Sequence, residues 1–124
     1  MVGKDIGIGI ENHLKEKGWK GMIFKDVRNR NIEYTLIRQQ HIEEQHPIMR
    51  EQIDKLQETL TNPDKIVRSN TDPNVELFYR HYKITPVTEK YFCIVVKILP
   101  DNYFIITMYF TDKIKRGDIL WKRQ

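Results

Sequence analysis

The stretch from Val75 to Thr111 limits the choice of fold more than any other part of the chain. It holds three runs rich in β-branched and aromatic residues, separated by short connections at 84–89 and 100–102. Such runs are typical of β-strands, and connections this short join antiparallel neighbours. The stretch therefore predicts an antiparallel β-meander.

Side chains alternate along each predicted strand, so the meander has two faces. We expect one face to be core, with the rows Val75, Leu77 and Tyr79; Phe92, Ile94, Val96 and Ile98; and Phe104, Ile106, Met108 and Phe110. The opposite face would then carry Glu76, Phe78, Arg80, Tyr82, Lys97, Thr107 and Tyr109. Two interpretations of that face stay open. It is either an ordinary solvated side of a sheet, or a platform where cations bind phosphates and rings stack on bases.

The segment before the meander predicts two helices. Thr35 is a suitable N-cap, and the helix that follows it should end before Pro47. A second helix is expected from about Ile48 to Leu60. It would present one apolar stripe to the core, formed by Met49, Ile53, Leu56 and Leu60.

Short strands are expected at residues 21–26, 31–36, 65–69 and 119–121. The first two form a β-ribbon, and residues 1–20 before it are expected to be an N-terminal arm or a short helix. The predicted fold class is therefore α+β, with two helices packed on one face of a four- to five-stranded antiparallel sheet. Residues 21–124 would form a single domain, a size that can bury a real core.

Charge and cysteine content narrow the class of protein. The formal net charge of +4 permits nucleic-acid contact without requiring it. The lone cysteine, Cys93, excludes an internal disulfide and fits a reducing cytoplasm. No apolar run approaches the roughly 20 residues of a membrane span, and we expect no signal peptide. The expected location is the cytoplasm, without membrane contact.

The histidines suit proton transfer better than metal binding. His41 and His46 are five residues apart, so their rings do not lie on one helix face as in the metalloprotease pattern. With a single cysteine and no clustered carboxylates, we expect neither a structural zinc site nor a metal-dependent nuclease site, and no cofactor. Imidazole titrates near neutral pH and can pass a proton without a metal.

Arg80 and Lys97 are the candidate phosphate ligands. If neighbouring strands pair in simple register, both cations share a face with Thr107, and the guanidinium can hold a phosphate through two hydrogen bonds. The competing interpretation pairs these cations with acidic residues such as Glu76 or Glu89.

Two further features also have two interpretations. Lys115 lies in the basic loop 113–117, which is either simply solvated or extends a phosphate-binding rim. Trp121 either stacks on a base or closes the core.

A set of ordered motifs resembles a known family. The motifs are HIEEQHP (41–47), LTNPD (60–64), YRHY (79–82), VVK (95–97), IITMY (105–109) and KRGDILW (115–121). Together they resemble small bacterial and phage proteins of the barnase/EndoU/colicin/RelE-like (BECR) nuclease superfold, in its phage-associated branch. The resemblance covers roughly residues 24–121. It implies helices packed on an antiparallel sheet, and metal-independent RNA cleavage on the open face of that sheet.

The same resemblance implies roles for individual residues. In such a reaction the ribose 2′-hydroxyl attacks its own phosphate, leaving a 2′,3′-cyclic phosphate and a 5′-hydroxyl end. His41 would transfer the proton, with Glu76 as the alternative base. Arg80 would clamp the phosphate, Thr107 would donate a hydrogen bond to it, and Lys97 would be a secondary cation. The expected substrate-binding residues are His46, Tyr82, Tyr109, Lys115 and Trp121.

The leading hypothesis is therefore a small metal-independent endoribonuclease that binds RNA. Such an enzyme could be the toxin of a toxin–antitoxin or phage-conflict system, with an acidic antitoxin as its protein partner. An exposed edge strand or the N-terminal arm could support a homodimer. The alternative is a non-catalytic nucleic-acid-binding or protein-interaction module on the same fold.

Overall fold

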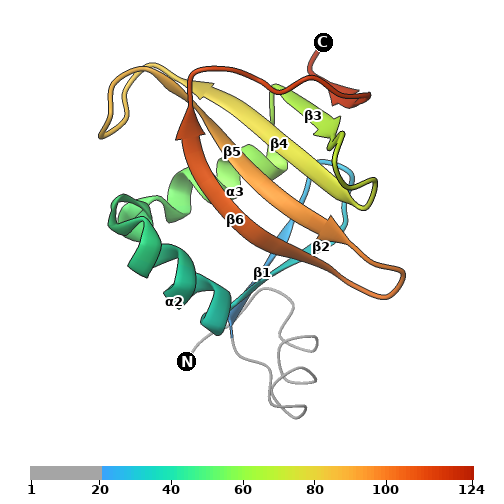
Figure 1. Cartoon of the computed structure of the whole chain (residues 1–124), viewed down its shortest axis with the longest axis horizontal. Helices are drawn as coiled ribbons and strands as arrows, with labels where there is room; N and C mark the ends of the chain where they lie inside the picture. Colours follow the sequence, from blue (N-terminus) through green and yellow to red (C-terminus); the bar gives the residue numbers. More distant parts are fainter. Residues whose placement is uncertain (1–20) are drawn as a thin grey trace.

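A seven-stranded sheet forms the centre of the computed structural model, which describes residues 21–124 (Figure 1). The strand order is β1-β2-β6-β5-β4-β3-β7. The strands are β1 (Gly21–Lys25), β2 (Asn31–Thr35), β3 (Lys65–Arg68), β4 (Val75–Tyr82), β5 (Lys90–Ile98), β6 (Tyr103–Thr111) and β7 (Ile119–Lys122). The arm or helix expected at residues 1–20 lies outside the described residues.

The α+β class is confirmed, but the predicted sheet of four to five antiparallel strands is wrong. The sheet is mixed, because β2 pairs in parallel with the start of β6 through Ile32 with Tyr103 and Glu33 with Phe104. All other neighbouring strands are antiparallel. The β1–β2 ribbon therefore belongs to the same sheet as the meander. Pairing between segments so far apart in the chain leaves no local signal in the sequence.

The first helix follows the prediction, and the second is divided. Helix α2 (Leu36–Gln45) begins at Thr35, whose hydroxyl accepts a hydrogen bond of 3.2 Å from the Arg38 N–H. A 3₁₀ turn, η1 (Pro47–Glu51), then precedes α3 (Ile53–Thr61). The Gln52 N–H donates to the Met49 carbonyl, which ends the 3₁₀ turn before α3 starts.

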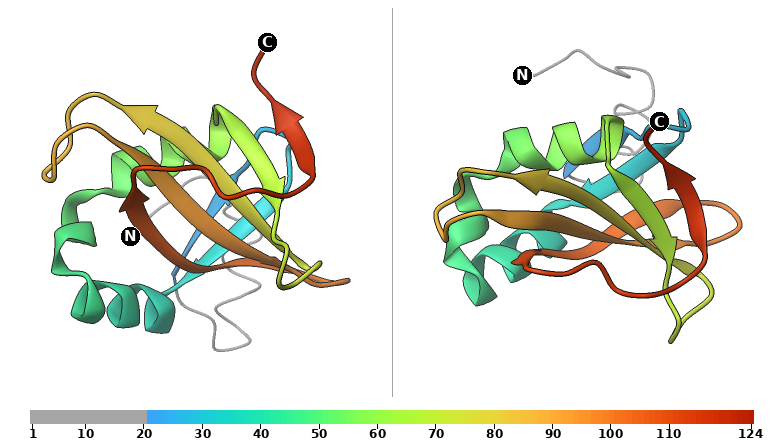
Figure 2. Two further views of the ribbon diagram at one scale, coloured as in Figure 1. Left: turned by 45° about the horizontal axis from the view of Figure 1, so that its top comes forward. Right: turned by 90° about the horizontal axis from the view of Figure 1, so that it is seen from above.

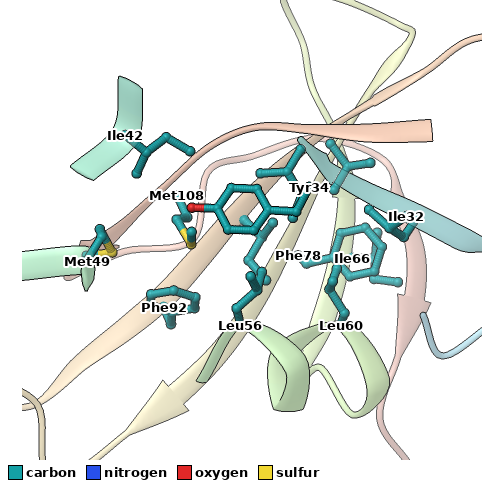
Figure 3. Close-up of a cluster of buried hydrophobic side chains, with 13 residues drawn as sticks. Ile32, Tyr34, Ile42, Met49, Leu56, Leu60, Ile66, Phe78, Phe92 and Met108 are labelled. Atoms are coloured by element: carbon teal, nitrogen blue, oxygen red, sulfur yellow. The ribbon is translucent and has the colours of Figure 1, made fainter. Parts of the chain in front are cut away.

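Both helices pack on one face of the sheet. The main core lies between the helices and that face (Figure 3). The helical residues in it are Ile42, Met49, Leu56 and Leu60, and the strand residues include Tyr34, Ile66, Phe78, Phe92, Ile94, Val96 and Met108. The predicted stripe is thus confirmed except for Ile53, which is exposed at the start of α3, directly after the break at Gln52. Burying each such apolar side chain contributes about 1.5–3 kcal/mol.

The predicted faces are right for β5 and reversed for β4. Phe92 and Ile94 of β5 face the helices, as expected. On β4, however, Phe78 faces the helices, while Leu77 and Tyr79 lie on the outer face, the face opposite the helices. Residues 75–79 of β4 are all buried, and both rows contain large apolar or aromatic side chains, so alternation alone does not reveal which row meets the helices.

A β-bulge changes the faces of β6. Thr107 pairs with Val95 and Ile105 pairs with Val96, so Ile106 is an extra residue on β6. Because of the extra residue, Ile105 and Met108 both reach the main core, and Ile106 packs on the outer face. The predicted core row is therefore wrong at Ile106 and right at Met108 and Phe110. The bulge has no sequence signal, since residues 103–111 are apolar or aromatic almost throughout.

A second, smaller cluster covers part of the outer face. It contains Val67, Val75, Leu77, Tyr79 and Cys93, with Ile114 packed against them. Ile114 belongs to the segment that joins β6 to β7 and crosses this face (Figure 2). That segment approaches β3 very closely at Gly117, where a Cβ atom would lie 2.2 Å from the Arg68 carbonyl oxygen. Only glycine fits there.

Four charged side chains hold the β1–β2 turn against β4. The Arg30 Nη2 lies 2.7 Å from a Glu76 oxygen and 2.8 Å from an Asp26 oxygen, and Arg28 also pairs with Glu76. Burial alone would lower the pKa of Arg30, but its hydrogen bonds to Glu76 and Asp26 more than offset this and raise it. The Arg30 guanidinium also lies 5.0 Å from the centre of the Tyr103 ring. Two cations and two carboxylates thus form a neutral, largely buried ion cluster.

Replacing Glu76 with glutamine should lower the free energy of unfolding by about 2 to 3 kcal/mol, because it leaves two partly buried arginines with one carboxylate between them. Urea unfolding followed by tryptophan fluorescence measures this loss. Glu44→Gln is the matched control, since Glu44 is exposed on α2, and it should change stability by less than about 0.5 kcal/mol. Equal losses in the two variants would contradict a stabilising role for the cluster.

Candidate functional site

The structure does not bring Arg80 to the outer face. The Arg80 Nη1 donates a 2.7 Å hydrogen bond to the Asn62 carbonyl at the end of α3, and Nη2 lies 3.4 Å from a Glu58 oxygen. Its guanidinium also lies 5.7 Å from the centre of the Tyr82 ring. Arg80 therefore sits on the helix side, occupied by structural partners.

Lys97 of β5 lies on the outer face. It is beside the start of β4, whereas Arg80 is near the end of that strand. Its position on β5 pairs with Val75, whereas Arg80 pairs with Phe92. The Lys97 Nζ lies 2.6 Å from Asp72, and this hydrogen bond lowers the pKa of the Asp72 carboxyl. The expectation that Arg80 and Lys97 share a face is therefore wrong, because the faces of β4 are reversed. The competing interpretation, that both cations pair with acidic residues, holds. The partner of Arg80 is Glu58 and that of Lys97 is Asp72, rather than the Glu76 or Glu89 named as examples.

The histidines predicted to act lie apart from these cations. His41 is exposed on α2, and His46 is exposed at its C-cap, where its N–H donates to the Ile42 carbonyl. Within residues 21–124, no hydrogen bond or ion pair joins either imidazole to Arg80, Lys97 or Thr107. The predicted catalytic set is not assembled.

The remaining predicted residues divide between the two sides. Tyr82 faces the helices and donates a 2.8 Å hydrogen bond to Glu58, and Trp121 packs at the margin of the main core. Thr107 and Tyr109 lie on the outer face, as predicted. The side chain of Lys115 is exposed there, and its backbone N–H donates to the Tyr79 hydroxyl.

Glu76, the alternative base, is 7% exposed and engaged by two arginines. It shares the helix-side face with Arg80, as its spacing on the strand predicts, but it belongs to the buried ion cluster. A general base must reach a substrate proton. Glu76 is not placed to do so.

The structure brings together a different group around His81. The His81 Nε2 lies 2.8 Å from a Glu89 oxygen, and the imidazole packs edge-on against Tyr91 at 5.2 Å between ring centres. Beside them, the Lys90 Nζ lies 2.6 Å from Asp112. These five residues line an open pocket of about 260 Å³, called the His81 pocket below.

Local structure explains why these residues meet. His81 and Tyr91 are paired positions on β4 and β5, so their side chains lie on the same face. The connection between the strands returns Glu89 to His81, and Thr85 helps to hold it by accepting a 3.0 Å hydrogen bond from the Val87 N–H. The sequence did not single out His81, because by alternation it continues the predicted core row of Val75, Leu77 and Tyr79. Its position two residues after Tyr79, near the end of a strand, was the available signal.

The geometry of His81 suits proton transfer. The Glu89 carboxylate, 2.8 Å from Nε2, favours the tautomer that carries its proton on Nε2, which leaves Nδ1 as the base. Among residues 21–124 no hydrogen bond occupies that Nδ1. The His81 side chain is 37% exposed, which gives a solute access to it.

Cys93 and its two tyrosine neighbours are poor candidates for chemistry at neutral pH. Burial raises the pKa of the Cys93 thiol to about 11. Burial also raises the pKa of Tyr79 and of Tyr109. All three groups therefore stay protonated near pH 7, and they pack beneath the segment that carries Ile114.

Residues 21–124 contain no group of three or more His, Cys, Asp or Glu side chains arranged to hold a metal ion. No helix in the same range is long and apolar enough to cross a membrane.

No family model, no curated protein and no solved structure matches the chain. The resemblance to the nuclease superfold therefore stays a prediction from the sequence.

The Cys93 thiol should react with a thiol reagent at pH 8 at least roughly 100-fold more slowly in the folded protein than in urea, because labelling requires local opening. Equal rates in the two conditions would show that the outer-face cluster is not closed.

The free energy of unfolding should fall as the pH rises above about 9, the ordinary pKa of a thiol. The raised pKa values of Cys93, Tyr79 and Tyr109 mean that the unfolded chain loses these protons first. Urea midpoints measured between pH 7 and pH 11 would record this fall. Midpoints that stay constant above pH 9 would contradict it.

Proposed function

We propose that the protein is a metal-independent endoribonuclease in which His81 transfers the proton. The observation that carries the proposal is the accessible imidazole of His81, held by Glu89 and packed against Tyr91. An imidazole oriented by a carboxylate is a recurrent proton-transfer unit, because the carboxylate selects the tautomer and stabilises the imidazolium.

The reaction needs only groups of this chain, its RNA substrate and water. His81 Nδ1 takes the proton of the ribose 2′-hydroxyl as the 2′-oxygen forms a bond to phosphorus. The bond from phosphorus to the 5′-oxygen breaks, and that oxygen takes a proton from water. The products are a 2′,3′-cyclic phosphate and a 5′-hydroxyl end. Lys90 lines the same pocket, and a phosphate that displaced Asp112 from its ammonium would meet its positive charge.

The charge next to the His81 pocket suits a phosphate polymer. The loop after β6 carries three exposed cations, Lys113, Lys115 and Arg116. Lys113 directly follows Asp112 of the pocket, and the Lys115 backbone is bonded to Tyr79. Exposed lysines and arginines near a site attract RNA through its phosphates. If the activity harms the cell that makes it, an acidic antitoxin is the expected protein partner.

One observation favours a second function, a non-catalytic nucleic-acid-binding or protein-interaction module. Arg80 and Lys97 are both engaged by carboxylates, on opposite faces of the sheet. Ribonuclease sites usually gather several cations around one phosphate. On this reading the exposed loop cations bind RNA, and His81 with Glu89 is a surface ion pair.

The proposal predicts that the purified protein cuts RNA in the presence of EDTA and leaves 2′,3′-cyclic phosphate ends. His81→Gln should lower the rate about 10² to 10⁴-fold, the usual contribution of a positioned acid–base group. His41→Gln is the matched control and should change the rate less than about threefold, because that imidazole is exposed on α2 away from the pocket. Denaturing gels and end-group analysis on a panel of RNAs measure both effects.

Other results would replace the proposal with a defined alternative. A larger loss in His41→Gln than in His81→Gln would return the catalytic role to the residue that the sequence favours. Ends with 3′-hydroxyls would exclude the transesterification. Binding of RNA without any cleavage would support the non-catalytic module.

A further inference from the structure

The turn Asn62–Pro63–Asp64 joins three parts of the molecule. Asn62 caps the end of α3, Pro63 is buried, and Asp64 leads into β3. The Asp64 N–H donates to the Tyr79 carbonyl of β4 at 2.7 Å, and its carbonyl accepts from the Arg123 N–H, just after β7, at 3.0 Å. The turn thus lies between β4 and the end of β7.

The Asp64 carboxylate uses its two oxygens for two different partners. Oδ2 accepts a 2.7 Å hydrogen bond from the His81 N–H. Oδ1 accepts from Nε and Nη2 of Arg123, at 3.1 and 2.8 Å. The β3–β4 ladder begins at Lys65 with Tyr79, so His81 lies beyond it. The Asp64 side chain therefore takes the place of a strand carbonyl for the backbone of His81.

Arg123 also fixes the rest of the turn. Its Nη1 donates to the Asn62 side-chain oxygen at 2.7 Å, and its Nη2 donates to the Asn62 carbonyl at 2.9 Å. A planar guanidinium that bonds several oxygens at once holds them in one geometry, which an ammonium cannot do. Arg80 reaches the turn only at the Asn62 carbonyl and so cannot replace Arg123 at Asp64.

We propose that Arg123 is a positioning residue for His81. Arg123 fixes the Asp64 carboxylate, Asp64 fixes the backbone of His81, and the imidazole is thereby held against Glu89 and Tyr91. The catalytic consequence rests on the proposed function, whereas the positional effect stands on the hydrogen bonds alone. A catalytic group displaced by about 1 Å can lose about 100-fold in rate.

Arg123→Gln in the full chain tests the proposal, with Lys122→Gln as the matched control because Lys122 is an exposed cation on β7. NMR follows the His81 amide exchange rate and the imidazole signals, which the nearby Tyr91 ring shifts. In Arg123→Gln we expect amide exchange at least roughly 10-fold faster and imidazole signals closer to those of free histidine. On RNA, kcat should fall about 10-fold with KM nearly unchanged, and Arg123→Lys should recover part of this loss.

The outcomes separate this proposal from the proposed function. Unchanged His81 signals and kcat in Arg123→Gln, with only a lower urea midpoint, would overturn the positioning role. If the wild type cuts no RNA but the His81 signals move as expected in Arg123→Gln, the positioning role is supported and the nuclease function is contradicted. Asp64→Asn is the second variant if Arg123→Gln does not fold. It keeps an acceptor for the His81 N–H but removes the charge that Arg123 binds, and unchanged His81 signals there would also overturn the proposal.

Discussion

The packing of Phe78 beneath α3 sets the placement of the polar residues on β4. Phe78 is fully buried with Leu56 and Leu60 in the main core. Because side chains alternate along a strand, this contact turns Arg80 toward the helices and His81 toward the outer face. A register shifted by one residue would exchange these two positions, and with them the residue that solvent can reach.

The fold also determines which cations are paired with carboxylates and which stay exposed to solvent. The net charge of +4 suggests a basic surface, yet the two cations expected to bind phosphate, Arg80 and Lys97, are held by carboxylates. Arg30 belongs to the buried ion cluster, and Arg80 and Lys97 are engaged by Glu58 and Asp72. The partly exposed pairs of Arg80 and Lys97 add little stability, whereas breaking the buried cluster would leave a charge without its partner. Three exposed cations, Lys113, Lys115 and Arg116, lie on the loop next to the His81 pocket.

The sequence predicts correctly those features that depend on interactions between residues close together in the chain. Thr35 caps α2 through a contact three residues away, and the alternation of β5 is clear because its core-facing row is uniformly apolar. The errors fall where distant segments meet. The parallel pairing of β2 with β6, the bulge at Ile106 and the orientation of β4 all depend on contacts between different elements of the fold. His81 was missed for the same reason.

The sequence by itself determined the α+β class, the start of α2, most of the strands and the supply of histidines and cations, because these follow from local periodicity, capping and composition. The tertiary structure alone decided which of those residues meet. Phe78 and Leu77 are both apolar, so only the placement of the helices could choose which of them faces the core. That choice, made by packing rather than by any local preference, separates Arg80 from Lys97 and places His81 beside Glu89.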